Sequence, residues 1–465
     1  MKKTLIAILM IYSSLYSKDI TLNLNEAIDT ALKNNALNRI SKLNLQIAQA
    51  QYQQALSANY PSLDAIMYAS RDKNDTIFQQ RGAFTLPAYL GTAFQAFAPS
   101  GTDTSSISAD LDTKARGRDT VVGQLELNYP LYTGGKISAI IEQARLNKDI
   151  AKQSIIRDKN SIIFDVKKYY YGYVLTNELS RIIKKIHKRM KFSTELTKDF
   201  LENGSDLKIK RTDYLSAKLT TSLLQSTLSK IELNKKLLVN AISNLLGLKI
   251  NDNLRIKYKE QNILKQNSSL QDLIKKSYAL NPDMNKINLA IKIKDEQVLE
   301  ASANNYPMVN LFGNVSHTYN SYEYGYLNKD NENSWTIGLA LKLSLFDGFK
   351  TKNQVIEKKL DKKVYEEQKL LLEEGLAIQL KNEFIKSSIG FQQIDILGEA
   401  SKTASENSRL NYKAYQYEMA EAEDLIQSQL VEVYVKADYL KYIHDYLLSL
   451  ATIDKLVGAQ LSENF

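Results

Sequence analysis

The chain has 465 residues, of which 44% are hydrophobic and 24% are charged, so it is not a disordered chain and can form a substantial core. It contains no cysteine, which excludes disulfides and thiolate metal sites. The formal charge is +9, but the 61 basic residues are interleaved with 52 acidic ones. This pattern favours solvated helix faces over a nucleic-acid partner.

The N-terminus predicts a secretory signal. Lys2 and Lys3 precede an apolar run over residues 5–11, and small residues follow as far as Ser17. We therefore expect a signal peptide over residues 1–17. No later apolar run reaches the roughly eighteen residues that a membrane helix needs. The mature chain is then expected to be either soluble outside the cytoplasm or embedded as a β-barrel.

The chain contains the same helix phrases twice. Asn-Leu-Asn-Glu at 23–26 opens a helical pattern with an Asx cap, and Ser-Leu-Gln-Asp at 269–272 does so 246 residues later with a serine cap. At the same offset, Asn-Tyr-Pro occurs at 59–61 and again at 305–307. Because proline interrupts helical hydrogen bonding, we expect both helices to end there and strands to follow. The expected helices are residues 25–57 and 270–305.

Four later segments alternate between apolar and polar residues, as the wall of a membrane barrel would. In the clearest of them, Trp335, Ile337 and Leu339 share one face, with Thr336 and Gly338 on the other. Tyrosines gather at one end of the second hairpin, where an aromatic girdle would meet the membrane interface. A half-buried sheet in a soluble domain is the alternative. The segments are residues 63–74, 121–129, 309–319 and 335–345.

Glycine turns connect the strands to the helices that follow. The turn at 129–136 is echoed 214 residues later at 343–350, so Gly134, Gly135 and Gly348 mark the strand-to-helix turns. The difference between the offsets of 246 and 214 leaves 32 extra residues in the first hairpin. We expect a longer exposed loop there, over residues 83–114.

A very long helical pattern follows the first turn. Residues 136–203 contain no proline and one internal glycine, and their apolar residues recur at spacings of three, four and seven. At 1.5 Å per residue this helix would be roughly 100 Å long, too long for a globular core. A helix returns over about 210–247, and two shorter helices stacked end to end could run beside each long one. We expect the polar segment 251–268 to lie outside this helical wall.

These phrases, in this order and in duplicate, resemble the TolC-like outer-membrane efflux proteins. The resemblance covers nearly the whole mature chain and includes Leu-Asn-Glu-Ala-Ile at 24–28, the Asn-Tyr-Pro ends, the glycine turns and the tip phrases at 213–217 and 424–426. It implies an α+β fold in which an internally duplicated chain contributes four transmembrane β-strands and long coiled helices. Three chains would form a 12-stranded β-barrel continuous with a periplasmic α-helical barrel. The implied parts are a signal peptide at 1–17, a first repeat at 18–248, a connecting segment at 249–268 and a second repeat at 269–465.

Physical reasoning independently requires several copies. Four strands cannot close a barrel, and open sheet edges are not tolerated in hydrocarbon. Two chains would give about eight strands around a filled interior, whereas three give about twelve strands and a barrel that can be hollow. We therefore expect a homotrimer in contact with outer-membrane lipid.

The far ends of the helical hairpins are the expected periplasmic entrance. Gly204 aligns with Glu418 at an offset of 214, and Asp213 aligns with Asp424 at 211. The resemblance implies that acidic residues and one aromatic residue ring a constriction, where three copies would raise the carboxylate pKa values and favour cations. Gln427 stands where a second aspartate is common in the family, and solvated helix-end charges are the alternative. The implied entrance residues are Asp424, Glu421, Glu423, Tyr415 and Glu418, with Gly204 and Asp213 at the first tip.

The resemblance implies an outer-membrane channel of a Gram-negative bacterium, with its helical tube in the periplasm, that exports the substrates of an inner-membrane pump. Its implied partners are a periplasmic adaptor and a transporter of RND, ABC or MFS type, in efflux or type I secretion. A periplasmic coiled-coil scaffold or adaptor without a pore is the alternative. We expect no catalysis, cofactor or metal, because His187, His317 and His444 are scattered without metal-ligand spacing.

Overall fold

The computed structural model describes residues 19–204, 209–249, 252–258, 263, 265–329 and 332–460. The expected signal peptide, residues 1–17, lies outside this range. The chain divides into two compact units. The first contains residues up to Ala50, Arg145–Ile293 and the chain from Asp361 onward, and the second contains Gln51–Ala144 and Lys294–Leu360.

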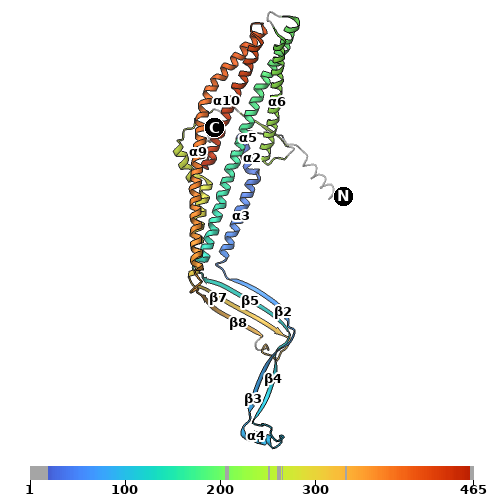
Figure 1. The fold of residues 1–465 in the computed structure, drawn as a ribbon, viewed down its shortest axis with the longest axis vertical. Coiled ribbons are helices and arrows are strands. Elements are labelled where there is room, and N and C mark those ends of the chain that lie inside the picture. The colour runs from blue at the N-terminus through green and yellow to red at the C-terminus, as the bar shows by residue number, and fades with distance from the viewer. Residues whose placement is uncertain are drawn as a thin grey trace, which may run out of the picture. The chain divides into compact units, whose positions relative to one another are not determined.

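Long helices make up most of the first unit, as Figure 1 shows. The helix expected over 136–203 is confirmed as α5 (Lys136–Asn203), and the returning helix is α6 (Arg211–Leu245). The second repeat has the same pair, α9 (Lys350–Gln416) and α10 (Ala422–Val457). Within the described part of the chain, no helix combines the length and hydropathy needed to cross a membrane.

Each helix expected before a strand is broken in two, which corrects the prediction of single helices over 25–57 and 270–305. The breaks fall at Asn35 and Asn281, whose backbones are extended. Asn35 Nδ2 donates to the Leu245 carbonyl oxygen at 3.0 Å, and Asn281 Nδ2 donates to that of Leu456 at 2.8 Å. In both, the side-chain oxygen accepts an N–H from the first turn of the next helix. The helices are α2 (Leu24–Asn34), α3 (Ala36–Ser57), α7 (Leu270–Leu280) and α8 (Pro282–Ser302), with a short 3₁₀ turn, η1 (Ala303–Asn305), before the strand.

The returning helices end against these breaks at matching glycines. Gly247 follows α6 with φ 65°, and Gly458 follows α10 with φ 85°. A Cβ at Gly458 would lie 2.7 Å from the Leu280 carbonyl oxygen, and one at Gly247 would lie 3.0 Å from that of Asn34. Both sites need a residue that adopts positive φ and has no side chain. We call the place where a returning helix ends against a break a joint. The two repeats therefore build this joint in the same way.

The main core of the first unit lies where the first of these joints, at Asn35 and Gly247, meets the long helices. Its members come from α2, α5, α6, α9 and α10, together with Leu254 in the connecting segment. Part of that segment, which was expected to be loose, forms strand β6 (Asn253–Ile256), which pairs in parallel with β1 (Asp19–Leu22). Buried core residues include Ala27, Val166, Tyr170, Ile242 and Tyr446.

The second unit contains one sheet built from both halves of the chain. Its four antiparallel strands lie in the order β2-β5-β7-β8, so the central pair joins the first repeat to the second. All four expected strands are present with shifted ends. They are β2 (Ser62–Arg71), β5 (Asp119–Tyr132), β7 (Met308–Asn320) and β8 (Asn333–Lys342).

The predicted loop over residues 83–114 is wrong. The chain there forms a separate antiparallel ribbon of β3 (Thr76–Thr85) and β4 (Ser106–Arg116), joined by the short helix α4 (Ala88–Gln95). Glycine and proline suggested a loop, but they occur mainly at the ribbon's end, whereas β-branched and aromatic residues occupy β3. The 32 additional residues of the first hairpin thus form a folded element.

Candidate functional site at the helix tips

The connection between α9 and α10 contains the predicted tip residue Glu418. Its φ is 58°, in the left-handed region that favours glycine, and Gly204 at the end of α5 has φ 88°. The Met419 N–H donates to the Ala414 carbonyl oxygen at 2.8 Å, which closes the last turn of α9. Glu418 and Gly204 therefore share a positive φ, although a glutamate replaces the glycine.

Three predicted acidic residues lie together at the start of α10. Glu421 is the cap position, and Glu423 and Asp424 are in the first turn. All three side chains are exposed. The free N–H groups of a helix N-terminus stabilise negative charge, so these carboxylates are placed where the helix favours them. Each copy of the chain thus presents three acidic groups within four residues.

The predicted aromatic residue Tyr415 is fully buried and does not lie at the surface of the single chain. Its hydroxyl shares a hydrogen bond with Thr197 Oγ1 at 2.6 Å, and its ring meets the edge of Phe200 at 5.9 Å between centroids. Burial raises the pKa of Tyr415, and the Asp213 carboxylate raises it further. Tyr415 therefore joins α9 to α5 just behind the acidic turn.

Asp213, predicted at the first tip, has a structural role there. Its Oδ2 accepts the Lys210 N–H at 2.8 Å and so caps the start of α6. Gly204 ends the preceding helix α5. Within the described residues the two tips thus differ in chemistry, because the first turn of α10 gathers several exposed carboxylates and that of α6 contains Asp213 as its acidic residue.

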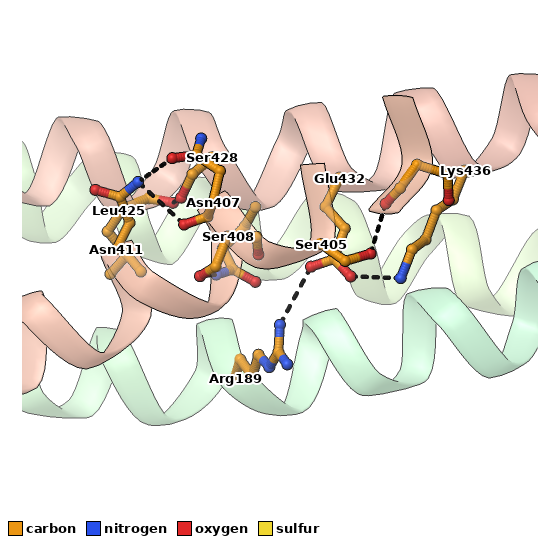
Figure 2. Close-up of polar contacts among 11 residues, drawn as sticks. Arg189, Ser405, Asn407, Ser408, Asn411, Leu425, Ser428, Glu432 and Lys436 are labelled. Carbon is orange, nitrogen blue, oxygen red and sulfur yellow. Dashed lines mark hydrogen bonds and ion pairs between the residues drawn. The ribbon is translucent and has the colours of Figure 1, made fainter. Parts of the chain in front are cut away.

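A buried ionic network lies on the same helices as the tip contacts. Glu432 of α10 is 1% exposed, and it pairs with Lys436 Nζ at 2.6 Å and with Arg189 Nη1 of α5 at 3.2 Å. Figure 2 shows the three side chains converging between the helices. The Arg189 guanidinium also lies 5.7 Å from the centre of the Tyr412 ring. The network therefore joins the α5 hairpin to the α9–α10 hairpin.

Burial tends to raise the pKa of the Glu432 carboxyl, but the hydrogen bond from Lys436 and the charges of Lys436 and Arg189 outweigh it, so the pKa is lowered. Sequence reasoning missed this residue because it treated charges as solvated. The available signal was spacing: Glu432 follows the buried Leu425 by seven residues and so occupies the same helix face.

Other buried polar groups surround this network. Gln429 Nε2 donates to the Ser408 carbonyl oxygen at 3.0 Å. Gln429 Oε1 and Ser193 Oγ have no hydrogen-bond partner among the described residues. Since an unpaired buried polar atom costs free energy, these two atoms lower the stability that the layer contributes.

The predicted strand-to-helix turns are present in the second unit. Gly134 and Gly135 have φ values of 64° and 90°, and Gly348 has φ 67°. Phe349, the counterpart of Gly135, also has positive φ, 65°. Within the described residues, no group of three histidines, cysteines or carboxylates could hold a metal ion.

Comparisons with known proteins give a match to one family model and a shared fold. Residues 27–248 match the family model described as outer membrane efflux protein. The CmeC outer membrane channel of Campylobacter jejuni superposes with a TM-score of 0.73 at 15% identity, covering 95% of this chain and 87% of that one. VceC, an outer membrane protein of Vibrio cholerae, gives a TM-score of 0.71 at 17% identity, covering 94% of this chain and 96% of that one.

A membrane protein from Pseudomonas aeruginosa is similar to the same degree, with a TM-score of 0.72, 16% identity and coverage of 93% of each chain. No curated protein sequence matches. At these identities the structural likeness establishes the fold of the chain.

Proposed function

We propose that three copies of the chain form a channel-tunnel that exports substrates from an inner-membrane pump through the periplasm to the exterior, because residues 27–248 match the family model described as outer membrane efflux protein. The second unit would lie in the outer membrane of a Gram-negative cell, and the long helices would extend into the periplasm. A periplasmic adaptor and a transporter of RND, ABC or MFS type would complete the assembly.

The observation that carries this proposal is the division of the four-stranded sheet into an apolar and a polar face. In the register of the sheet, Leu125 lies opposite Val315, which lies opposite Trp335. Most of the other residues on this face are apolar, with His317 and Asn333 as a polar pair, whereas Glu126 pairs with Asn314 on the other face. Apolar residues of the first face that are exposed in the single chain are Leu63, Met67, Leu125, Val315, Trp335, Ile337, Leu339 and Leu341. Lipid would cover this face, and the polar face would line water.

The sheet has two free edges, and these support assembly into a closed ring. Strands β2 and β8 each have one neighbour within the chain. In a membrane their unpaired backbone groups would cost several kcal/mol each, so an edge must pair with the edge of another copy. Three copies give about twelve strands, enough for a hollow interior.

Assembly and insertion can be tested directly. The purified mature chain is expected to form a detergent-stable trimer whose mobility in gels changes on heating, and to produce conductance steps in planar bilayers. A water-soluble monomer without affinity for bilayers would refute the proposal. The same result would favour the coiled-coil scaffold, which has no use for an apolar sheet face.

We infer that the acidic turn of α10 lines the periplasmic entrance of this channel. In a trimer, Asp424, Glu421 and Glu423 of three copies, with Glu418, would converge, raise one another's carboxyl pKa values and attract cations. Tyr415 would act from behind, as a positioning residue that holds this turn against α5.

The entrance can be tested by single-channel recording of Asp424→Ala. Removing three carboxylates from the ring is expected to weaken block by divalent cations added on the helical side, because less negative charge remains to bind them. The matched control is Glu202→Ala, which removes an exposed carboxylate from the first tip. Equal cation block in the wild type and in Asp424→Ala would show that Asp424 does not line the entrance.

A further inference from the structure

The end of the ribbon formed by β3 and β4 is apolar and uncharged. No charged residue occurs between Arg81 and Asp103, a stretch that contains α4 and both of its connections to the ribbon. We call residues 86–102 the ribbon tip; the exposed Asp103 follows it directly. At the base of the ribbon, Lys114 and Arg116 pair with Asp75 and Asp72 at 2.8 Å each.

The ribbon tip is folded and carries aromatic side chains on its surface. The Leu86 N–H donates to the Ser105 carbonyl oxygen at 2.9 Å, and Thr104 Oγ1 donates to that of Gly91 at 2.9 Å, which holds α4 against the end of β4. Phe97 is 92% exposed and Tyr89 is 72% exposed, and Phe94 is also exposed. A fixed element that presents large apolar groups to water indicates a contact surface.

The base of the ribbon is tied to the second half of the chain. Asn320 is buried, and its Oδ1 accepts the Gly117 N–H at 2.7 Å while its Nδ2 donates to Thr120 Oγ1 at 2.8 Å. The Tyr326 N–H donates to the Ala115 carbonyl oxygen at 3.1 Å. The ribbon therefore leaves the sheet from a fixed base, at the end of β2 and β5 away from the Gly134 turn.

We propose that the ribbon tips of three copies pack against one another and form a cap over the external mouth of the channel. This cap rests on the trimer of the proposed function. Its contact surface is formed by Tyr89, Phe94 and Phe97, and the partner of each tip is the same surface on the other two copies.

The absence of charge favours identical copies as the partner. Three identical tips that meet on a symmetry axis bring like groups together, and any charged residue there would be repelled by its own copies. A tip with no charge over Gly82–Thr102 avoids this repulsion. Neutrality offers no comparable advantage at an anionic lipid surface, where basic residues are the groups that bind.

The ribbon is also long enough. Ten residues of β3 span about 33 Å at 3.3 Å per residue. Twelve strands spaced by about 4.8 Å and tilted by about 40° close into a barrel with a radius of roughly 12 Å. A ribbon based on the barrel rim can therefore reach the axis.

The absence of cysteine allows a direct test by cross-linking. In Ser100→Cys, an exposed residue of the ribbon tip is replaced and the aromatic residues are kept. Mild oxidation of the dilute trimer is expected to give disulfide-linked dimers, because a disulfide forms only when the Cα atoms are about 4.4–6.8 Å apart. The matched control Lys73→Cys, at the ribbon base, should stay unlinked because it lies near the barrel wall.

The cause of the contact is tested by changing Tyr89, Phe94 and Phe97 to serine in the Ser100→Cys chain. The cross-linked fraction should fall at least about tenfold, and conductance in bilayers should rise because the mouth is uncovered.

A gel-stable trimer in which the introduced thiol does not cross-link would overturn the cap and leave the channel intact. The reactivity of the introduced thiol towards a water-soluble maleimide gives a second readout. If the thiol becomes unreactive only when lipopolysaccharide vesicles are added, the tip contacts the membrane and the cap proposal is overturned. A chain that forms no trimer overturns both proposals.

Discussion

The two helical repeats are alike at their joints and different near their tips. Asn35 and Asn281 break the chain in the same way, and Gly247 and Gly458 end the returning helices in the same geometry. At the tips, glycine is replaced by Glu418, and the position of the buried Glu432 corresponds to Thr221, which shares a neutral hydrogen bond with Thr194 at 2.9 Å. Backbone geometry restricts the joints to a few residue types, whereas side-chain contacts allow the tips to diverge.

The largest expected effect follows from removing Glu432, a buried charge whose counterpart in the first repeat is the neutral Thr221. Glu432→Ala leaves Arg189 and Lys436 without their buried carboxylate and should lower the stability of the helical unit by about 3 kcal/mol. Thr221→Ala, at the matching position of the first repeat, should cost about 1 kcal/mol. Thermal unfolding of the purified protein, followed by circular dichroism, compares the two. Equal losses would show that the repeats do not differ in this respect.

The joint glycines should come next. Gly458→Ala places a Cβ 2.7 Å from the Leu280 carbonyl oxygen at a φ of 85° and should cost about 2 kcal/mol or more. Gly204→Ala is the control, because its φ of 88° is similar and no atom of the described residues lies within 4 Å of the new Cβ, so about 1 kcal/mol is expected. The shifts in unfolding temperature should keep this order, and a reversed order would mean that the close approach to α7 is not rigid.

Replacing Glu418 with glycine should make the two tips more alike. Since Glu418 has a φ of 58°, Glu418→Gly removes the cost of a left-handed residue and should stabilise the hairpin by about 1 kcal/mol. The measurement is the unfolding temperature, with Glu421→Gly as a control at a residue of extended backbone. An unfolding temperature lowered by Glu418→Gly would show that the glutamate side chain makes a compensating contact.

The smallest expected change is a dependence on acid. Because the folded pKa of Glu432 lies below its ordinary value of 4.5, its contribution to stability is fully present above about pH 4.5 and is lost as the pH falls through the folded pKa. Unfolding temperatures measured between about pH 3 and pH 7 should therefore fall more steeply for the wild type than for Glu432→Gln. If the unfolding temperatures of the two proteins fall in parallel, groups other than Glu432 cause the acid sensitivity.

Patterns that depend on the local chain were predictable, and those that depend on distant partners were not. The long helix α5 follows from apolar spacing without proline, so its ends agree with the prediction. The breaks at Asn35 and Asn281 depend on carbonyl groups about two hundred residues away, and no local pattern specifies them. The ribbon was missed because β3 is exposed on both faces and so has no apolar alternation.

The candidate site follows the same division. Glu421, Glu423 and Asp424 lie together because they are neighbours in sequence, which a motif can indicate. The burial of Tyr415 and Glu432 depends on Thr197 and Arg189 of another helix, so it became visible only when α5, α9 and α10 were placed together.

The parallel pairing of β1 with β6 also sets an order of events in biogenesis. Asp19 lies opposite Asn253, so the start of the described chain pairs with residues 234 positions later. During synthesis, these residues emerge long before their partner strand exists. The chain must therefore remain unfolded there until more than half of it has been delivered, and contacts of such long range form slowly. This interval is when a chaperone would have the most exposed chain to protect.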